Sequence, residues 1–134
     1  MKMKLHTDGG ARGNPGPGAG GIVLLNEKGS VVKEKGTFFG ICTNNEAEYR
    51  ALILGLEAAK GTSATELSVY LDSLLVVEQL NGNYKVKNQN LKKLWEEVQD
   101  LVKAFNKVEF VHVRRENNAH ADKLVNKVLD AAEQ

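Results

Sequence analysis

The spacing of hydrophobic positions changes along the chain, from short alternating or continuous apolar runs to longer repeats of three and four residues. Short apolar runs bounded by Gly, Pro, Asn or Ser favour β-strands. The first three runs are separated by a glycine- and proline-rich loop over 11–20 and a turn over 26–29, which predicts an antiparallel meander. The predicted strands are 3–8, 21–25, 30–39, 67–71 and 108–113.

Helix signals begin at Thr43. Thr43 and Glu46 have the spacing of a capping box, and Gly61 is a typical residue just beyond a helix C-terminus. Apolar residues that recur every three or four positions predict further helices towards the C-terminus. The predicted helices are 44–60, 73–80, 91–105 and 119–132.

These elements follow the order βββ-α-β-α-α-β-α. Strands that are joined through a helix run parallel, because the crossover returns the chain to the same end of the sheet. The sequence therefore predicts an α/β fold with a mixed five-stranded sheet and helices on both faces. In this sheet the first three strands are antiparallel and the last two are parallel to strand one. Ligands of such sheets tend to bind at the carboxyl ends of the central strands.

Composition narrows the class of protein. A chain of 134 residues suits a single domain over 1–134. The single cysteine, Cys42, excludes an internal disulfide framework and a cysteine-based zinc cluster, although a thiol beside a helix start could have a lowered pKa. No run of eighteen apolar residues occurs, so we expect no membrane span. We expect a cytoplasmic protein that acts as a monomer.

The charge balance excludes a further class of protein. Eighteen basic and seventeen acidic residues leave a formal net charge of +1, which excludes nucleic-acid binding through bulk positive charge. Any binding to nucleic acid would depend on where individual charges lie.

Acidic residues stand at the ends of predicted elements. Asp8 ends the first strand and Asp72 follows the fourth, so their carboxylates would meet if these strands are parallel neighbours. The alternative is that each aspartate caps a helix or opens a turn. Asp122 lies in the first turn of the last helix, where an acid is favourable without any function.

Glu48 is the most informative acid. It shares a helix face with Leu52, Gly55 and Ala59, which predicts that it points to the packed side. A buried carboxylate needs a metal, a partner or a raised pKa, whereas the plain alternative is a partner for the helix dipole. Several converging carboxylates would be neutralised by divalent cations, and oxygen-only ligands suit Mg²⁺ or Mn²⁺.

Other candidate features indicate structure rather than chemistry. We expect His6, His112 and His120 to be structural or surface residues, because no metal-binding spacing connects them. The glycines over 16–21 match a dinucleotide-binding pattern, but a β-type run follows them instead of a helix. We expect these glycines to serve turns or close backbone approach.

Four motifs in order resemble the ribonuclease HI family: 8–17 (DGGARGNPGP), 43–49 (TNNEAEY), 71–73 (LDS) and 115–122 (RENNAHAD). The segment 82–88 also resembles the family's linking segment. The resemblance implies the ribonuclease H-like fold. It also implies hydrolysis of the RNA strand of RNA–DNA hybrids by a two-metal-ion mechanism, which leaves 5′-phosphate and 3′-hydroxyl ends.

The resemblance also implies the site residues. The family's catalytic and metal-binding quartet falls on Asp8, Glu48, Asp72 and Asp122, with two Mg²⁺ ions in the reactive complex and Mn²⁺ as a possible substitute. The positions expected to contact the hybrid are Gly10, Asn14, Asn44, Asn45, Ser73, Lys85, Lys87 and Arg115.

The chain departs from the family pattern at two places. Leu74 stands where many members have Gln, and 113–118 replaces a His-bearing glycine loop, as in the shorter branch of the family. Arg115 could supply charge in place of that histidine. We expect no separate hybrid-binding domain in this length. Two alternatives stay open: a non-catalytic nucleic-acid-binding domain of this fold, and a nuclease of this fold that acts on double-stranded RNA or DNA junctions.

Overall fold

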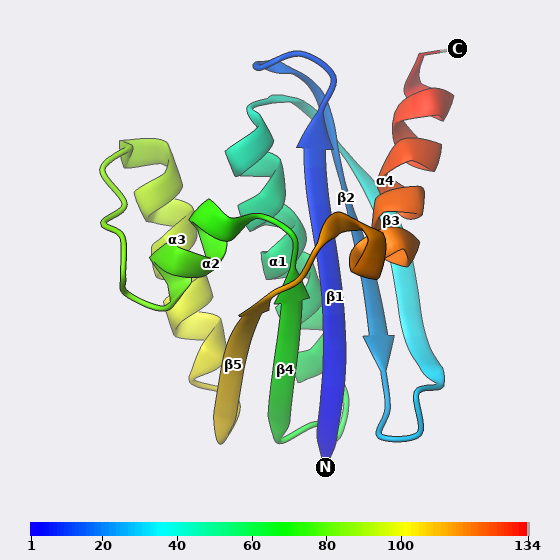
Figure 1. The fold of residues 1–134 in the computed structure, drawn as a ribbon, viewed down its shortest axis with the longest axis vertical. Helices are drawn as coiled ribbons and strands as arrows, with labels where there is room; N and C mark the ends of the chain where they lie inside the picture. The colour runs from blue at the N-terminus through cyan, green and yellow to red at the C-terminus, as the bar shows by residue number, and fades with distance from the viewer. Residues whose placement is uncertain (134) are drawn as a thin grey trace.

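The computed structural model describes residues 1–133, and its sheet confirms the predicted α/β fold. The sheet order is β3-β2-β1-β4-β5; β1, β2 and β3 are antiparallel, whereas β4 is parallel to β1 and β5 is parallel to β4. Figure 1 shows these elements: β1 (Lys2–Ala11), β2 (Gly16–Leu25), β3 (Val31–Cys42), α1 (Asn44–Lys60), β4 (Glu66–Leu71), α2 (Leu74–Leu80), α3 (Gln89–Val102), β5 (Lys107–His112), the 3-10 turn η1 (Arg115–Asn118) and α4 (Ala119–Ala132).

The predicted loop over 11–20 is wrong for most of its length. β1 continues to Ala11 and β2 begins at Gly16, so the connection covers only 12–15. Gly20 and Gly21 of β2 make room for helices instead of forming a turn. A Cβ on Gly20 would lie 2.8 Å from the Ala51 Cβ of α1, and a Cβ on Gly21 would lie 2.4 Å from the Ala121 carbonyl oxygen of α4.

Helices therefore cover both faces of the sheet, as predicted. Consecutive residues of a strand point to opposite faces, so Gly20 lies under α1 and Gly21 under α4. Figure 1 shows α4 over β2 and β3, and α1 on the other side of the sheet. The main core lies beneath α1, where Leu5, Leu52 and Val69 are fully buried.

The helix ends follow their sequence signals. The Thr43 hydroxyl accepts a hydrogen bond from the Glu46 N–H, and the Glu46 side chain accepts one from the Thr43 N–H, which confirms the capping box. The end of α3 is less well predicted. This helix covers Gln89–Val102 instead of 91–105, although Phe105 beyond its end is still buried.

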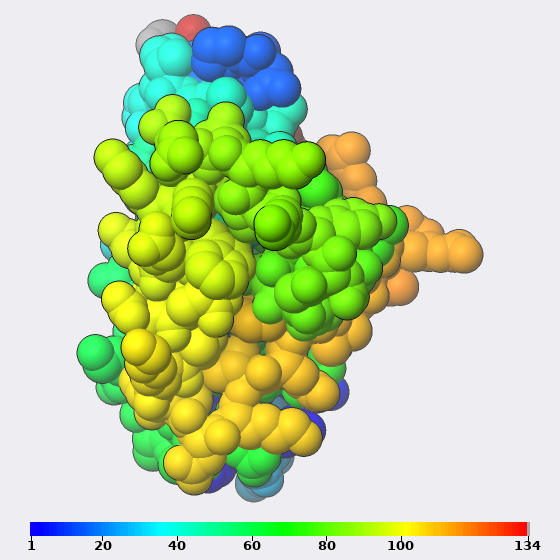
Figure 2. Space-filling view, turned by 90° about the vertical axis from the view of Figure 1, so that its left-hand side faces the viewer, coloured from blue at the N-terminus to red at the C-terminus, as the bar shows by residue number. Residues whose placement is uncertain are grey.

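A buried polar contact holds the smaller helices against α1. The Tyr49 hydroxyl of α1 donates a hydrogen bond of 2.7 Å to Gln79 of α2, and the Trp95 indole N–H of α3 donates one of 3.3 Å to the Gln79 carbonyl oxygen. Figure 2 shows α3 and the segment 81–88 side by side on this face of the molecule. Within residues 1–133, no helix combines the length and the hydrophobicity needed to cross a membrane.

Candidate active site

Three carboxylates meet at the carboxyl end of the central strands. Asp8 lies on β1, Glu48 on α1 and Asp72 directly after β4, and each offers an oxygen atom within 4.8 Å of the other two. β1 and β4 are parallel neighbours, which brings Asp8 and Asp72 to the same region of the sheet. Asp8 and Glu48 are buried. The geometry therefore gathers three of the four acids that the sequence singles out.

Close approach of β1 to α1 fixes Glu48. Its Oε1 accepts a hydrogen bond of 2.8 Å from the Gly9 N–H. A Cβ on Gly9 would lie 2.2 Å from the Ala47 carbonyl oxygen, so a larger residue there would separate the strand from the helix. The Glu48 Oε2 is buried and has no hydrogen-bond partner in the part of the chain that the structure describes. An unpaired carboxylate oxygen beside two further acids fits a divalent cation.

Burial and mutual repulsion raise the pKa values of these acids. The pKa of Asp8 rises from 3.8 to about 7, first because the side chain is buried and second because Asp72 lies nearby. Burial and the Asp8 charge raise the pKa of Glu48 well above its ordinary value. The pKa of Asp72 is also raised, by burial and then by Asp122. A bound cation would oppose all three shifts because it favours the charged forms.

Asp122 lines the same cleft, of about 360 Å³, but lies outside the three-carboxylate cluster. It lies in the first turn of α4, as predicted. Its Oδ1 lies 3.4 Å from Arg115 Nη2, and its Oδ2 accepts a hydrogen bond of 3.3 Å from Asn126 Nδ2. The fourth acid is therefore held by two polar side chains on the wall of the cleft.

Several residues predicted to contact substrate surround the cleft. Gly10, Asn44 and Arg115 line it. The Asn44 N–H donates a hydrogen bond of 3.0 Å to Asn14 Oδ1, while Asn44 Oδ1 accepts one of 2.8 Å from the Ala11 N–H. These bonds connect the loop after β1 with the start of α1.

Two further predicted contacts lie beside this region. Asn45 and Asn14 line a smaller pocket of about 230 Å³ next to the start of α1. The Ser73 hydroxyl accepts a hydrogen bond of 3.3 Å from the Val76 N–H and caps α2. Ser73 thus has a structural role in addition to any contact with a ligand.

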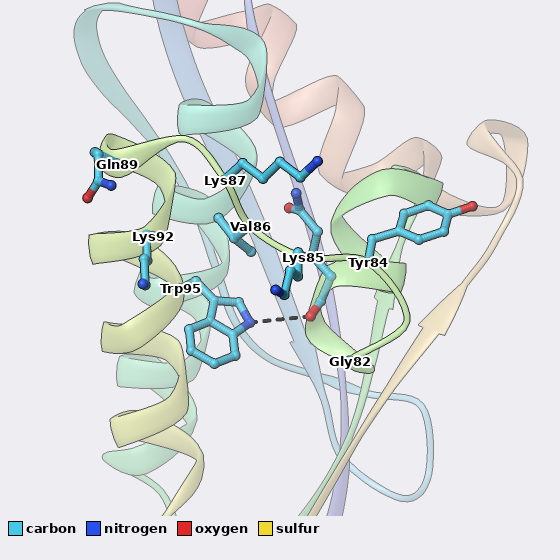
Figure 3. Close-up of a pocket in the computed structure, with 9 residues that line it drawn as sticks. Gly82, Tyr84, Lys85, Val86, Lys87, Gln89, Lys92 and Trp95 are labelled. Carbon is cyan, nitrogen blue, oxygen red and sulfur yellow. Dashed lines mark hydrogen bonds between the residues drawn. The ribbon is translucent and has the colours of Figure 1, made fainter.

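Lys85 and Lys87 belong to a different pocket. This pocket has a volume of about 520 Å³ and lies where the segment after α2 approaches α3 (Figure 3). Tyr84, Lys92 and Trp95 also line it, and none of its lining residues is acidic. Cations beside aromatic rings suit the backbone and bases of a nucleic acid better than a metal ion.

Sequence reasoning missed two polar side chains of the carboxylate cleft, Arg12 and Asn126. Arg12 pairs with Asp130 at 2.7 Å and with Glu133 at 2.7 Å, close to the end of the chain. Asn126 follows Asp122 by four residues, which is one helical turn. That spacing is the feature of the sequence that could have indicated the contact between Asn126 and Asp122. No local pattern indicates the partners of Arg12.

The suggestion of a lowered pKa at Cys42 is wrong. Cys42 is buried, and burial raises the pKa of its thiol despite the nearby Arg50. The histidines lie as expected of structural or surface residues: His6 stacks on Tyr70 with ring centroids 4.8 Å apart, and His120 pairs with Glu34.

The sequence of this chain is similar to a known family model and to several known proteins. A family model described as reverse transcriptase-like matches residues 6–128. A bifunctional protein of Mycobacterium tuberculosis is 45% identical over 135 residues, which is 100% of this chain and 37% of that protein. The chain thus spans little more than a third of that relative. Ribonuclease HI of Halobacterium salinarum is 39% identical over 98% of this chain and 66% of its own length. Ribonuclease H of Rippkaea orientalis is 32% identical over 92% of this chain and 82% of its own length.

Solved structures agree in fold over nearly the whole chain. RNase H1 of Halobacterium salinarum superposes with a TM-score of 0.95 at 38% identity, covering 98% of this chain and 99% of that one. LC11-RNase H1, isolated from compost and solved in complex with an RNA/DNA hybrid, has a TM-score of 0.92 at 41% identity. That match covers 98% of this chain and 99% of the other.

Proposed function

Because the chain belongs to the ribonuclease HI family, we propose that it is an endoribonuclease that hydrolyses the RNA strand of RNA–DNA hybrids. In this proposal it uses two metal ions and leaves 5′-phosphate and 3′-hydroxyl ends. The convergence of Asp8, Glu48 and Asp72 within 4.8 Å carries the proposal. Support for the substrate comes from LC11-RNase H1, a structural relative that is described in complex with an RNA/DNA hybrid.

The proposed metal ligands are the four acids Asp8, Glu48, Asp72 and Asp122, with Mg²⁺ as the ion and Mn²⁺ as a substitute. When bound, a pair of such cations supplies an activated water and stabilises the leaving 3′ oxygen. The protein contributes rigid placement: Glu48 accepts a hydrogen bond from the Gly9 N–H and lies near the start of a capped helix. Among the described residues, Glu48 Oε2 is the buried carboxylate oxygen that has no hydrogen-bond partner, and a bound cation would supply one.

The proposed hybrid-binding surface extends from this cleft to the pocket in Figure 3. A hybrid shows 2′-hydroxyls of its RNA strand in a wide, shallow minor groove, and amide and backbone groups can recognise them. Lysine and arginine side chains would contact phosphates. The proposed contact residues are Gly10, Asn14, Asn44, Asn45, Ser73, Lys85, Lys87 and Arg115.

One assay tests the function and its alternatives. End-labelled RNA–DNA hybrid, RNA duplex, DNA duplex and a DNA junction are incubated with the protein in Mg²⁺, in Mn²⁺ or in EDTA. We expect metal-dependent cleavage of the hybrid alone. Binding without cleavage would identify a non-catalytic nucleic-acid-binding domain, and cleavage of another substrate would identify a nuclease of different specificity.

Substitution of Asp72 tests the site. Asp72→Asn removes one carboxylate charge from the cluster without changing its size, so we expect cleavage to be abolished while thermal unfolding stays cooperative. Asp100→Asn is the matched control, because Asp100 is exposed and pairs with Lys103 on the surface. Full activity of Asp72→Asn would refute the assignment of these acids.

We further propose that residues 1–134 act as one domain, as a monomer and in the cytoplasm. A lone buried cysteine suits a reducing compartment. Light scattering after size exclusion and imaging of the tagged protein in its host would test these points.

A further inference from the structure

Asp122 is held in a different way from Glu48. Glu48 is fixed by a backbone N–H, whereas both oxygens of Asp122 are contacted by side chains, Arg115 on Oδ1 and Asn126 on Oδ2. The Asp122 side chain is 26% exposed, so it is more mobile than the buried acids unless these contacts restrain it. Its orientation therefore depends on its polar neighbours.

Asn126 joins Asp122 to Arg12. Its Nδ2 donates to Asp122 Oδ2 at 3.3 Å, and its Oδ1 accepts from Arg12 Nη2 at 3.5 Å. An ionised carboxylate only accepts hydrogen bonds and a guanidinium only donates them, so a bridge between the two needs a donor at one end and an acceptor at the other. The side-chain amide of Asn126 has both a donor and an acceptor. Its Nδ2 faces the carboxylate of Asp122 and its Oδ1 faces the guanidinium of Arg12.

Arg12 is itself anchored at two points. Its Nη2 and Nη1 each lie 2.7 Å from a carboxylate oxygen, of Asp130 and Glu133 respectively. The guanidinium connects the loop after β1 to α4, the helix that carries both Asn126 and Asp122. A planar fork with several N–H groups can bind two acids and still reach an amide, which a lysine ammonium cannot do equally well.

We propose that Asn126 and Arg12 are positioning residues that orient the Asp122 carboxylate for divalent-cation binding, with Arg12 acting through Asn126. The inference rests on the proposed function, because it takes Asp122 as the fourth carboxylate of the metal site. The two contacts that link Arg12 to Asp122 through Asn126, at 3.5 and 3.3 Å, are longer than usual N–H···O hydrogen bonds. Their effect is to restrict the rotamer of Asp122 and not to stabilise the fold strongly.

The first test measures metal binding without nucleic acid. Mg²⁺ raises Tm by binding the folded state, and the stabilisation follows RT ln(1 + [Mg²⁺]/Kd), so a fit of Tm against Mg²⁺ concentration gives Kd. We call this Kd the Mg²⁺ midpoint, because it is the concentration at which half of the folded molecules hold the ion. In Asn126→Ala we expect this concentration to be roughly 10-fold higher, as is usual when a residue behind a metal ligand is removed. Tm in EDTA should change little, because Ala is a better helix former than Asn.

Asn83→Ala is the matched control. Asn83 donates a hydrogen bond of 3.2 Å to Glu78, so this variant also removes an amide–carboxylate contact, outside the cleft. Its Mg²⁺ midpoint should equal that of the wild type. An unchanged midpoint in Asn126→Ala would overturn the proposal.

Double variants separate positioning from a general effect on the fold. If Asn126 acts through Asp122, Asn126→Ala causes no further shift in the Asp122→Asn background, and if Arg12 acts through Asn126, Arg12→Ala causes none in the Asn126→Ala background. Additive shifts in either pair would overturn that step. In cleavage assays over a range of hybrid concentrations, Asn126→Ala should lower kcat at limiting Mg²⁺ and leave KM for the hybrid unchanged. Its kcat should recover at high Mg²⁺.

The metal titration keeps this inference distinct from the proposed function. A wild-type protein that binds Mg²⁺ but cuts no hybrid would refute the function, while the Asn126→Ala midpoint would still decide the positioning role. A wild-type protein whose Tm does not respond to Mg²⁺ would refute both.

Discussion

At the scale of single residues, the folded site without metal disfavours the charged form of its acids. The pKa of Asp8 rises from 3.8 to about 7, so at neutral pH about half of the folded molecules carry a proton there, whereas the unfolded chain carries almost none. The folded state binds more protons between these two pH values, and its stability therefore falls as pH rises through that window. A bound cation removes this penalty because it stabilises the charged carboxylate.

Asp8→Asn tests this charge effect. The variant lacks the titrating group, so in EDTA at pH 8 its Tm should exceed that of the wild type by several degrees. The difference should shrink towards zero near pH 4, where Asp8 is protonated in the folded wild type. Scanning calorimetry at both pH values measures it, with the exposed Asp100→Asn as control. A difference that does not depend on pH would contradict the raised pKa.

At the scale of elements, the site depends on how closely a strand and a helix approach. Gly9 lets α1 pack so near to β1 that its N–H reaches Glu48, and a Cβ there would lie 2.2 Å from Ala47 O and 2.6 Å from Glu48 N. Gly10 is the next residue of the same strand, and a Cβ added to it would meet nothing within 4 Å among residues 1–133. Neighbouring glycines thus have opposite tolerance for a methyl group.

The pair Gly9→Ala and Gly10→Ala tests this packing. Gly9→Ala forces α1 away from β1, and overpacking of this kind costs about 1–3 kcal/mol. Gly10→Ala should change the free energy of unfolding by less than about 0.5 kcal/mol. Urea denaturation measures both. Equal effects in the two variants would mean that the strand–helix distance does not limit the residue at position 9.

At the scale of the whole molecule, charge is distributed unevenly. The formal net charge is +1, yet four acids gather around one cleft, and two bound divalent cations would add four positive charges. The segment 81–95 contains four lysines and no acid. An almost neutral protein can therefore present a basic surface to a nucleic acid once its metal site is filled.

The salt dependence of hybrid binding tests this surface. Lys85→Ala/Lys87→Ala should weaken binding and reduce the slope of log K against log salt by about 1 for each phosphate that the variant no longer neutralises. At saturating hybrid, kcat should stay unchanged, since neither lysine lines the carboxylate cleft. Lys103→Ala is the control, because Lys103 pairs with Asp100 at the far end of α3. An unchanged slope would exclude phosphate binding by these two lysines.

The sequence alone was enough to predict the order of the elements, the mixed sheet, and the α1 capping box at Thr43 and Glu46. It also predicted that Glu48 points inward, and that Asp8 and Asp72 would meet if their strands were parallel neighbours. These features depend on residue periodicity and on connections between consecutive elements, which a single sequence records directly.

Tertiary structure alone decided the features that depend on distance between remote segments. Gly20 and Gly21 belong to a strand and not to a loop, and each leaves room for a helix that packs against one face of the sheet. Burial, and not the nearby helix start, determines the pKa of Cys42. Arg12 contacts Asn126 and Glu133, which lie more than a hundred residues further along the chain. Local periodicity carries no record of such contacts, because they arise only when the packed helices and sheet bring distant side chains together.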